Sequence, residues 1–276
     1  MKRRPIIIDA CTLINLIRID EDDMLYNYLL SFNIKIAECV YKEIENNIFK
    51  SDSSKEMREK VNILLPRLLT FIETDDSIKA NIGNSECAQI KKLTHHIKED
   101  GEYYSLLLSL YQSRYFETQI NLYTDDKRAM QQFEEYFNLQ QLGVSGDSID
   151  LILFLYWHSN RISEMNLHRL LSNLRFEYCK EERIFIQEIE KFRAAITNNR
   201  KNSSIIRVLN SIIMSYRQGK YQQLYKAIDE IKNFPGKEIK QIIRKFAPNP
   251  STVSIVEKIN HVESLLIAHK ISLVSR

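Results

Sequence analysis

Long apolar runs are missing from this chain of 276 residues. No uncharged apolar stretch approaches the roughly 20 residues that cross a bilayer, so we expect no membrane helix. Only a few apolar residues separate the basic start, Met1–Arg4, from Asp9. That interval is too short for the apolar core of a secretory signal, so we expect no such leader.

Closely spaced cysteines are also missing. The four cysteines lie far apart and form no CxxC pair; they are Cys11, Cys39, Cys87 and Cys179. This spacing is typical of reduced thiols and predicts a cytoplasmic protein, with a disulfide as the alternative. No arrangement of Ser, His and Asp points to a nucleophilic hydrolase, and no internal repeat or low-complexity tract is present.

Short apolar runs are what the first part of the chain does contain. The run Pro5–Asp9 reads as a buried strand that ends in a carboxylate. Further strands are predicted at 34–37, 71–72, 120–123 and 139–144, with helical stretches between them. This alternation predicts an α/β fold with a parallel sheet. In such sheets the chemistry lies at the carboxyl ends of the strands, which is where Asp9 falls. The alternative is that Asp9 only caps the following helix.

The last part of the chain shows no strand pattern. Apolar residues at helical spacing predict helices over 167–200, 205–216, 221–233, 239–246 and 253–266. We therefore predict two domains, one over residues 1–165 and a helical one over residues 166–276.

The two predicted domains differ in charge. Residues 1–165 hold 19 Lys and Arg against 26 Asp and Glu, a net charge of −7, whereas residues 166–276 carry +10. This asymmetry favours an acidic catalytic part beside a basic part that binds a partner. A chance difference between two solvated surfaces is the alternative.

Four acidic residues occupy similar settings in the first domain: Asp9, Glu43, Glu102 and Asp126. Strand ends and helix N-termini can converge at one edge of a parallel sheet. Crowded carboxylates repel one another and stay ionised only when cations neutralise them. Hard divalent ions bind such oxygen ligands, activate water and stabilise displacement at a phosphodiester. The pattern predicts a metal-dependent hydrolase.

The motifs around these acids resemble those of PIN-domain nucleases, the family of VapC-like endoribonucleases. The resemblance covers residues 4–165 and is carried by Ile6–Asp9 with Thr12, Val40–Ile44, Asp100–Glu102, Tyr123–Ala129 and Leu142–Asp147. It implies a three-layer α/β/α sandwich with a central parallel sheet, followed here by an all-helical domain. Small toxins of this family end near the PIN domain, whereas this chain continues for about 110 residues.

The resemblance also implies roles for individual residues. Asp9, Glu43, Glu102 and Asp126 would be catalytic and would hold Mg²⁺ or Mn²⁺, with Thr12 beside Asp9 as a hydroxyl contact. Asp100 and Asp125 compete for these roles. We prefer Glu102, which directly precedes a buried helix, and Asp126, which fits the Thr-x-Asp spacing. Two further candidates are open: Asp147 as a fifth acid or a helix cap, and Lys127 with Arg128 as phosphate contacts or a solvated first turn.

The resulting hypothesis is a cytoplasmic endoribonuclease that acts as a toxin or a phage-defence effector. Its expected partners are RNA and an antitoxin or defence-system protein; self-association stays open. In the basic domain, four residues flank a polar stretch at 197–199 and form a candidate phosphate-binding edge: Arg193, Arg200, Lys201 and Arg207. The alternatives are a non-catalytic PIN-like interaction protein and a DNA nuclease.

Overall fold

A computed structural model describes residues 4–50, 54–95, 98–159, 162–198, 200–234, 236–248 and 252–268. The chain forms two compact units, Met1–Leu170 and Leu171–Arg276. Among the described residues, no helix combines the length and the apolar character needed to cross a membrane. Each unit is described separately below.

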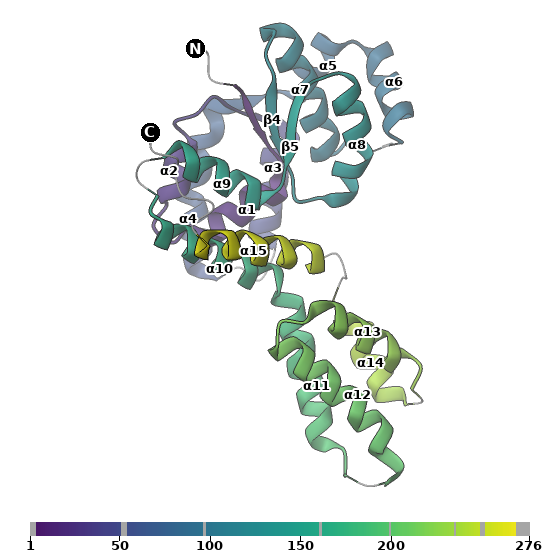
Figure 1. The fold of residues 1–276 in the computed structure, drawn as a ribbon. Coiled ribbons are helices and arrows are strands. Elements are labelled where there is room, and N and C mark those ends of the chain that lie inside the picture. Colours follow the sequence, from purple (N-terminus) through teal and green to yellow (C-terminus); the bar gives the residue numbers. More distant parts are fainter. Residues whose placement is uncertain are drawn as a thin grey trace. The chain divides into compact units, whose positions relative to one another are not determined.

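The first unit contains a parallel sheet of five strands in the order β3-β2-β1-β4-β5 (Figure 1). The strands are β1 (Ile6–Ile8), β2 (Ile34–Ala37), β3 (Ile72–Glu73), β4 (Ile120–Tyr123) and β5 (Gly143–Gly146). Every residue of β1 and β4 is buried, as expected for central strands of a sheet covered on both faces. The predicted α/β class with a central parallel sheet is confirmed.

Helices cover both faces of this sheet. The helices that begin in this unit are α1 (Ala10–Ile19), α2 (Met24–Leu29), α3 (Glu38–Lys50), α4 (Lys55–Leu64), α5 (Asp75–Ile82), α6 (Asn84–Thr94), α7 (Gly101–Phe116), α8 (Lys127–Leu139), α9 (Ser148–His158) and α10 (Glu164–Tyr178), with a 3₁₀ segment over Leu65–Phe71. Helix α7 packs on β1, β2 and β4, whereas α9 packs on β4 and β5. Successive side chains of β4 point to opposite faces, Leu122 towards α8 and Tyr123 towards α9.

The last strand differs from its prediction. Residues 139–144 were expected to form it, but Leu139 is the final residue of α8 and β5 begins at Gly143. The amphipathic pattern of α8 continues to Leu139, and a turn with Gln141 at a positive φ of 52° then redirects the chain. The apolar residues at 139 and 142 therefore belong to the helix end and the turn.

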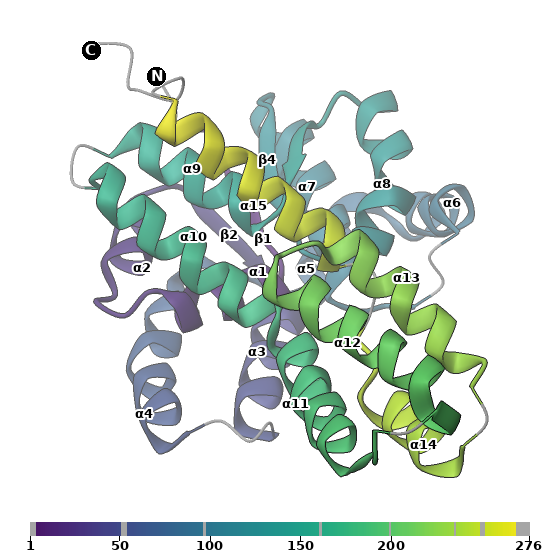
Figure 2. The ribbon, with the colours of Figure 1, turned by 60° about the horizontal axis from the view of Figure 1, so that its bottom comes forward.

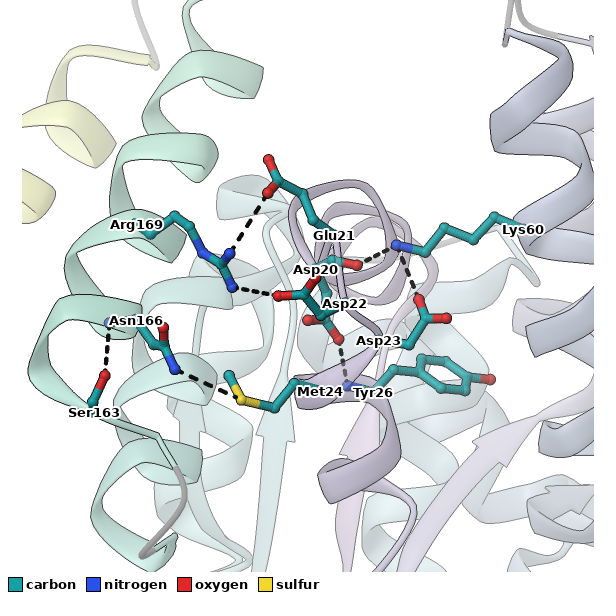
Figure 3. A network of polar contacts seen from close by, with 10 residues as sticks. All are labelled: Asp20, Glu21, Asp22, Asp23, Met24, Tyr26, Lys60, Ser163, Asn166 and Arg169. Atoms are coloured by element: carbon teal, nitrogen blue, oxygen red, sulfur yellow. Dashed lines mark hydrogen bonds and ion pairs between the residues drawn. The ribbon is translucent and has the colours of Figure 1, made fainter.

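Polar contacts hold the turn between α1 and α2 (Figure 3). Lys60 of α4 pairs with Asp23 at 3.0 Å and also donates to the backbone carbonyl of Asp20. Arg169 of α10 pairs with Asp22 at 2.8 Å and lies 3.7 Å from Glu21. Two basic side chains thus contact all four consecutive acidic residues, Asp20 through its backbone carbonyl.

The second unit is helical throughout its described residues. After the end of α10 come α11 (Lys180–Ala195), a 3₁₀ turn (Arg200–Asn202), α12 (Ser203–Arg217), α13 (Tyr221–Lys232), α14 (Lys237–Phe246) and α15 (Thr252–Ile267). Figure 2 shows α11, α12, α13 and α14 packed side by side. Their apolar faces meet in one core that includes Phe185, Leu209, Leu224 and Ile228. The predicted helical region is therefore present.

Candidate active site

Asp9 lies where β1 ends. The residue is 1% exposed, and its backbone amide donates to the carbonyl of Tyr123 on the neighbouring strand. It occupies the N-cap position of α1, but its side chain makes no capping hydrogen bond. Its Oδ2 instead accepts from the hydroxyl of Thr124 and the thiol of Cys11, each at 3.0 Å. The carboxylate is therefore oriented by side chains at the strand ends and does not act as a helix cap.

The second oxygen of Asp9 has a different environment. Oδ1 is buried and has no hydrogen-bond partner among the described residues. It lies near Gly101, the first residue of α7, where a Cβ would stand 3.4 Å from Asp9 Oδ1 and 2.8 Å from Glu43 Oε2. Two carboxylates thus converge on one glycine at a helix N-terminus, a position that favours negative charge. A Cβ at this position would displace the Glu43 oxygen, whereas its distance from Asp9 Oδ1 is an ordinary contact.

Burial and repulsion between carboxylates raise the pKa values of Asp9, Glu43 and Glu102. For Asp9 and Glu43 the main cause is burial, and the charges of Asp9 and Asp100 raise the pKa of Glu43 further. For Glu102 the pKa rises to about 7, first through burial and then through Asp9, Asp100 and Glu43. These four acids, Asp9, Glu43, Asp100 and Glu102, are called the site cluster below.

Asp100 and Glu102 therefore both lie in the cluster. Asp100 is the N-cap of α7, and its side chain accepts from the amide of Tyr103 at 3.3 Å. Glu102 lies in the first turn of that helix and makes no such cap. Asp100 therefore caps the helix, whereas the carboxylate of Glu102 is not used for capping. This difference is the reason to prefer Glu102 as a ligand.

The structure places Asp125 and Asp126 in different settings. Asp126 is the N-cap of α8, and its side chain accepts from the amide of Ala129 at 2.8 Å. Asp125 is the one whose charge raises the pKa of Asp9. Its carboxylate accepts from Asn15 and from the amide of Ser148, both at 2.8 Å. Asp125 is thus held beside Asp9, whereas Asp126 caps helix α8.

The remaining candidates are distributed as follows. Asp147 caps α9 in a reciprocal capping box with Asp150, the helix-cap alternative considered for it. Thr12 is fully buried, and its hydroxyl has no partner among the described residues. The hydroxyl contact expected from Thr12 is made by Thr124. Lys127 and Arg128 form the first turn of α8, where Arg128 is exposed.

Sequence reasoning missed four residues that orient these acids: Cys11, Asn15, Thr124 and Ser148. Burial raises the pKa of the Cys11 thiol, which therefore keeps its proton and donates a hydrogen bond to Asp9. Thr124 directly follows β4, so its place at the edge shared with Asp9 could have been read from the strand pattern. Asn15 and Ser148 reach Asp125 from two separate helices, α1 and α9, and no local pattern signals that meeting.

The site cluster suits a hard divalent cation. Across the ranges that the structure describes, no three His, Cys, Asp or Glu side chains stand in a ready metal-binding arrangement. The buried, unpaired Oδ1 of Asp9 and the facing Oε2 of Glu43 nevertheless offer the anionic oxygens that Mg²⁺ and Mn²⁺ bind. The residues present therefore fit such an ion.

Comparisons with known proteins identify no family for this chain. No family model matches it, no curated protein matches it, and no solved structure matches it. The resemblance to PIN-domain nucleases accordingly rests on the quoted motifs alone.

Proposed function

We propose that this chain is a metal-dependent endoribonuclease. The observation that carries the proposal is the site cluster, in which Asp9 Oδ1 is buried and unpaired in the described structure while Glu43 Oε2 faces the same glycine. Burying several carboxylates together is costly unless a cation compensates them. A site with this charge is suited to reactions at phosphodiesters, where the substrate needs positive charge that the cluster alone lacks.

The acids of the site cluster take the binding roles. Asp9, Glu43 and Glu102 would hold Mg²⁺ or Mn²⁺, and Asp125 or Asp126 would complete the set from the end of β4. Thr124 and Cys11 keep Asp9 oriented so that Oδ1 stays available. When bound, such an ion lowers the pKa of water and stabilises negative charge on the phosphate.

RNA as the substrate, and a role as a toxin or phage-defence effector with an antitoxin or defence protein as partner, follow from the resemblance alone. The discriminating experiment incubates the full chain with single-stranded RNA and DNA of matched sequence, in Mg²⁺, Mn²⁺ or EDTA, beside the Asp9→Asn variant. We expect RNA to be cut in metal only, and only by the wild type. Cutting of DNA alone would indicate a DNA nuclease. Cutting of neither would favour a non-catalytic interaction protein.

The basic second unit supplies phosphate contacts in this proposal. Its candidate edge includes Arg193, which donates to Asn210 at 3.1 Å, and Arg207, whose side chain is 79% exposed and lies 4.0 Å from Glu230. Arg200 starts the 3₁₀ turn, while Asn199 and the side chain of Lys201 fall outside the described residues. Basic side chains that neutralise phosphates release counterions, so affinity depends on salt.

The test of this edge reverses its charge in the full chain. Glutamate at 193, 200, 201 and 207 should weaken RNA binding and reduce the slope of log affinity against log salt, by about 0.7 for each lost contact with a single strand. The same slope in both proteins would show that the edge does not bind RNA and would leave a protein partner as its occupant.

A further inference from the structure

An open cavity lies on the first unit, lined by residues of β4, β5 and α9. Its volume is about 720 Å³. Asn121, Tyr123, Val144 and Gly146 form its floor, because they point to the same face of the two paired strands. Val144 is 59% exposed, so no helix closes this side of the sheet edge.

Aromatic rings form the wall of this cavity. Phe154 of α9 lies 4.2 Å from the ring of His158, 5.4 Å from Phe32 and 6.3 Å from Tyr123, between ring centroids. Trp157, which also lines the cavity, is 50% exposed. We call this set the aromatic groove: Tyr28, Phe32, Tyr123, Phe154, Trp157 and His158. The exposed ring of Trp157 can stack on a planar group, while the more buried rings support the wall.

One polar side chain lies on the floor of the cavity. Asn121 is 8% exposed and lines the cavity. Its amide can both donate and accept hydrogen bonds with a ligand bound there. Arg4 also lines the cavity, and its guanidinium group can contact a phosphate. Stacking surface, an amide and a cation together match a nucleotide better than an aliphatic chain.

One end of the groove lies at the strand ends beside Asp9. The carbonyl of Tyr123 accepts from the amide of Asp9, and the carbonyl of Gly146 accepts from the amide of Thr124, both at 2.9 Å. The same residues thus line the groove and hold the strand ends that carry the acids. The four residues of β4 span about 13 Å, a length that extends away from the cluster.

We propose that the aromatic groove binds unpaired bases of a single-stranded RNA whose cleaved phosphate lies at the site cluster. The inference rests on the proposed function and names how that site takes its substrate. The base stacks on the exposed ring of Trp157, Asn121 pairs with its edge, and Arg4 meets a phosphate. Stacking accepts every base, so the groove favours single strands over duplex and gives little sequence preference.

Trp157 makes the inference directly measurable, because it is the one tryptophan of the chain. A short single-stranded oligoadenylate is titrated into the full chain in EDTA, and tryptophan emission is followed together with the anisotropy of a labelled copy. We expect saturable quenching with the same midpoint as binding. An abasic strand of equal length should bind more weakly and leave the emission unchanged.

Two variants and a matched control sharpen the result. Trp157→Ala and Asn121→Leu should each weaken oligoadenylate binding about tenfold, the scale of one lost stacked base. Tyr115→Ala, which removes an exposed ring of α7 outside the groove, should bind as the wild type does. Unchanged affinity in both groove variants would overturn the inference, as would binding without quenching. Emission that responds to an apolar peptide but not to RNA would assign the groove to a protein partner.

The two proposals fail separately. RNA that quenches Trp157 but is never cut in metal would leave the groove assignment standing and remove the nuclease. Suppose that RNA is cut but does not change Trp157 emission, and that the groove variants bind it as the wild type does. This result would support the nuclease and contradict the groove as its RNA-binding surface.

Discussion

Two groups of carboxylates lie in the first unit, and they differ in what faces them. The turn of Asp20, Glu21, Asp22 and Asp23 is met by the cations of Lys60 and Arg169 (Figure 3). Asp20 Oδ2 also accepts from the amide of Tyr26 at 2.8 Å. Although burial raises the pKa of Asp20, backbone donors and Lys60 counteract the rise. This turn is called the paired cluster below.

Among the residues that the structure describes, no cation compensates the site cluster in this way. The groups that lower the pKa of Asp9 are neutral donors, Cys11, the Ala10 amide and Thr124, while Asp125 raises it. At Glu43 only Asn47 opposes burial and the charges of Asp9 and Asp100. Uncompensated burial of charge destabilises a fold, whereas a ligand that binds the folded state restores stability. The comparison shows that cations compensate acids of the paired cluster, whereas in the proposed function a bound cation would compensate the site cluster.

The largest expected effect comes from Asp9→Asn. RNA cleavage should fall by about 100-fold or more, the scale of removing a principal electrostatic group from an active site. Without metal the variant should be more stable than the wild type, because like-charge repulsion falls. Cleavage rates and thermal unfolding in EDTA check both statements.

The matched control for this variant is Asp22→Asn in the paired cluster. It removes an exposed acid from Arg169 and should leave cleavage unchanged. Full activity in Asp9→Asn would end the assignment of the site cluster.

A second prediction ranks the two acids at the start of α7. Glu102→Gln should slow single-turnover cleavage about tenfold more than Asp100→Asn, because Asn keeps the cap on Tyr103 while Gln removes a ligand charge. The opposite ranking would move the ligand role to Asp100.

Gly101→Ala tests the space between the carboxylates. The new Cβ would stand 2.8 Å from Glu43 Oε2 and 3.2 Å from Val40, so the Glu43 carboxylate must move. We expect the Mg²⁺ concentration for half-maximal cleavage to rise about tenfold. An unchanged metal requirement would show that Glu43 does not hold the ion.

The raised pKa of Glu102 predicts how pH affects the metal-free protein. Its ordinary value is 4.5 and its folded value about 7, so the unfolded chain loses this proton first as pH rises. Stability should therefore fall between about pH 4.5 and pH 7 and level off above. Glu102→Gln should match the wild type in acid and exceed it in stability at pH 8, as measured by urea unfolding in EDTA. A pH-independent difference would contradict the assigned cause.

The smallest effect is expected in the paired cluster. Arg169→Gln loses ion pairs with the exposed acids Asp22 and Glu21, and should cost about 0.5 kcal/mol of unfolding free energy. Metal binding and cleavage should not change. A loss of metal binding would show that the two clusters are coupled.

The fold was predictable to the extent that its signals are local. The isoleucine run ending at Asp9 and the apolar run at 120–123 identify two central strands, since buried parallel strands read as continuous apolar runs. The edge strand β5 was misplaced because Gly143–Gly146 offers one apolar side chain, which is exposed. An edge strand with a solvent-exposed face has few buried apolar residues, so its sequence shows little of the pattern by which strands are predicted.

The site was predictable in its acids and less so in their surroundings. Asp9, Glu43 and Glu102 follow from strand ends and helix starts, and the structure brings them together. The choice between Asp125 and Asp126 depends on which carboxylate caps α8, and the structure shows that Asp126 does. The sequence does not show in which direction either side chain points. The role of Thr124 arises from contact between residues 115 positions apart.

The most direct test of the account is the binding of Mn²⁺ itself, measured by calorimetric titration into the metal-free full chain. The wild type and Asp22→Asn should bind the ion alike, with a thermal stabilisation that grows with its concentration. Asp9→Asn should show little or no binding heat and little stabilisation. Equal binding by the wild type and Asp9→Asn, or none by the wild type, would contradict the assignment of the site cluster to a cation.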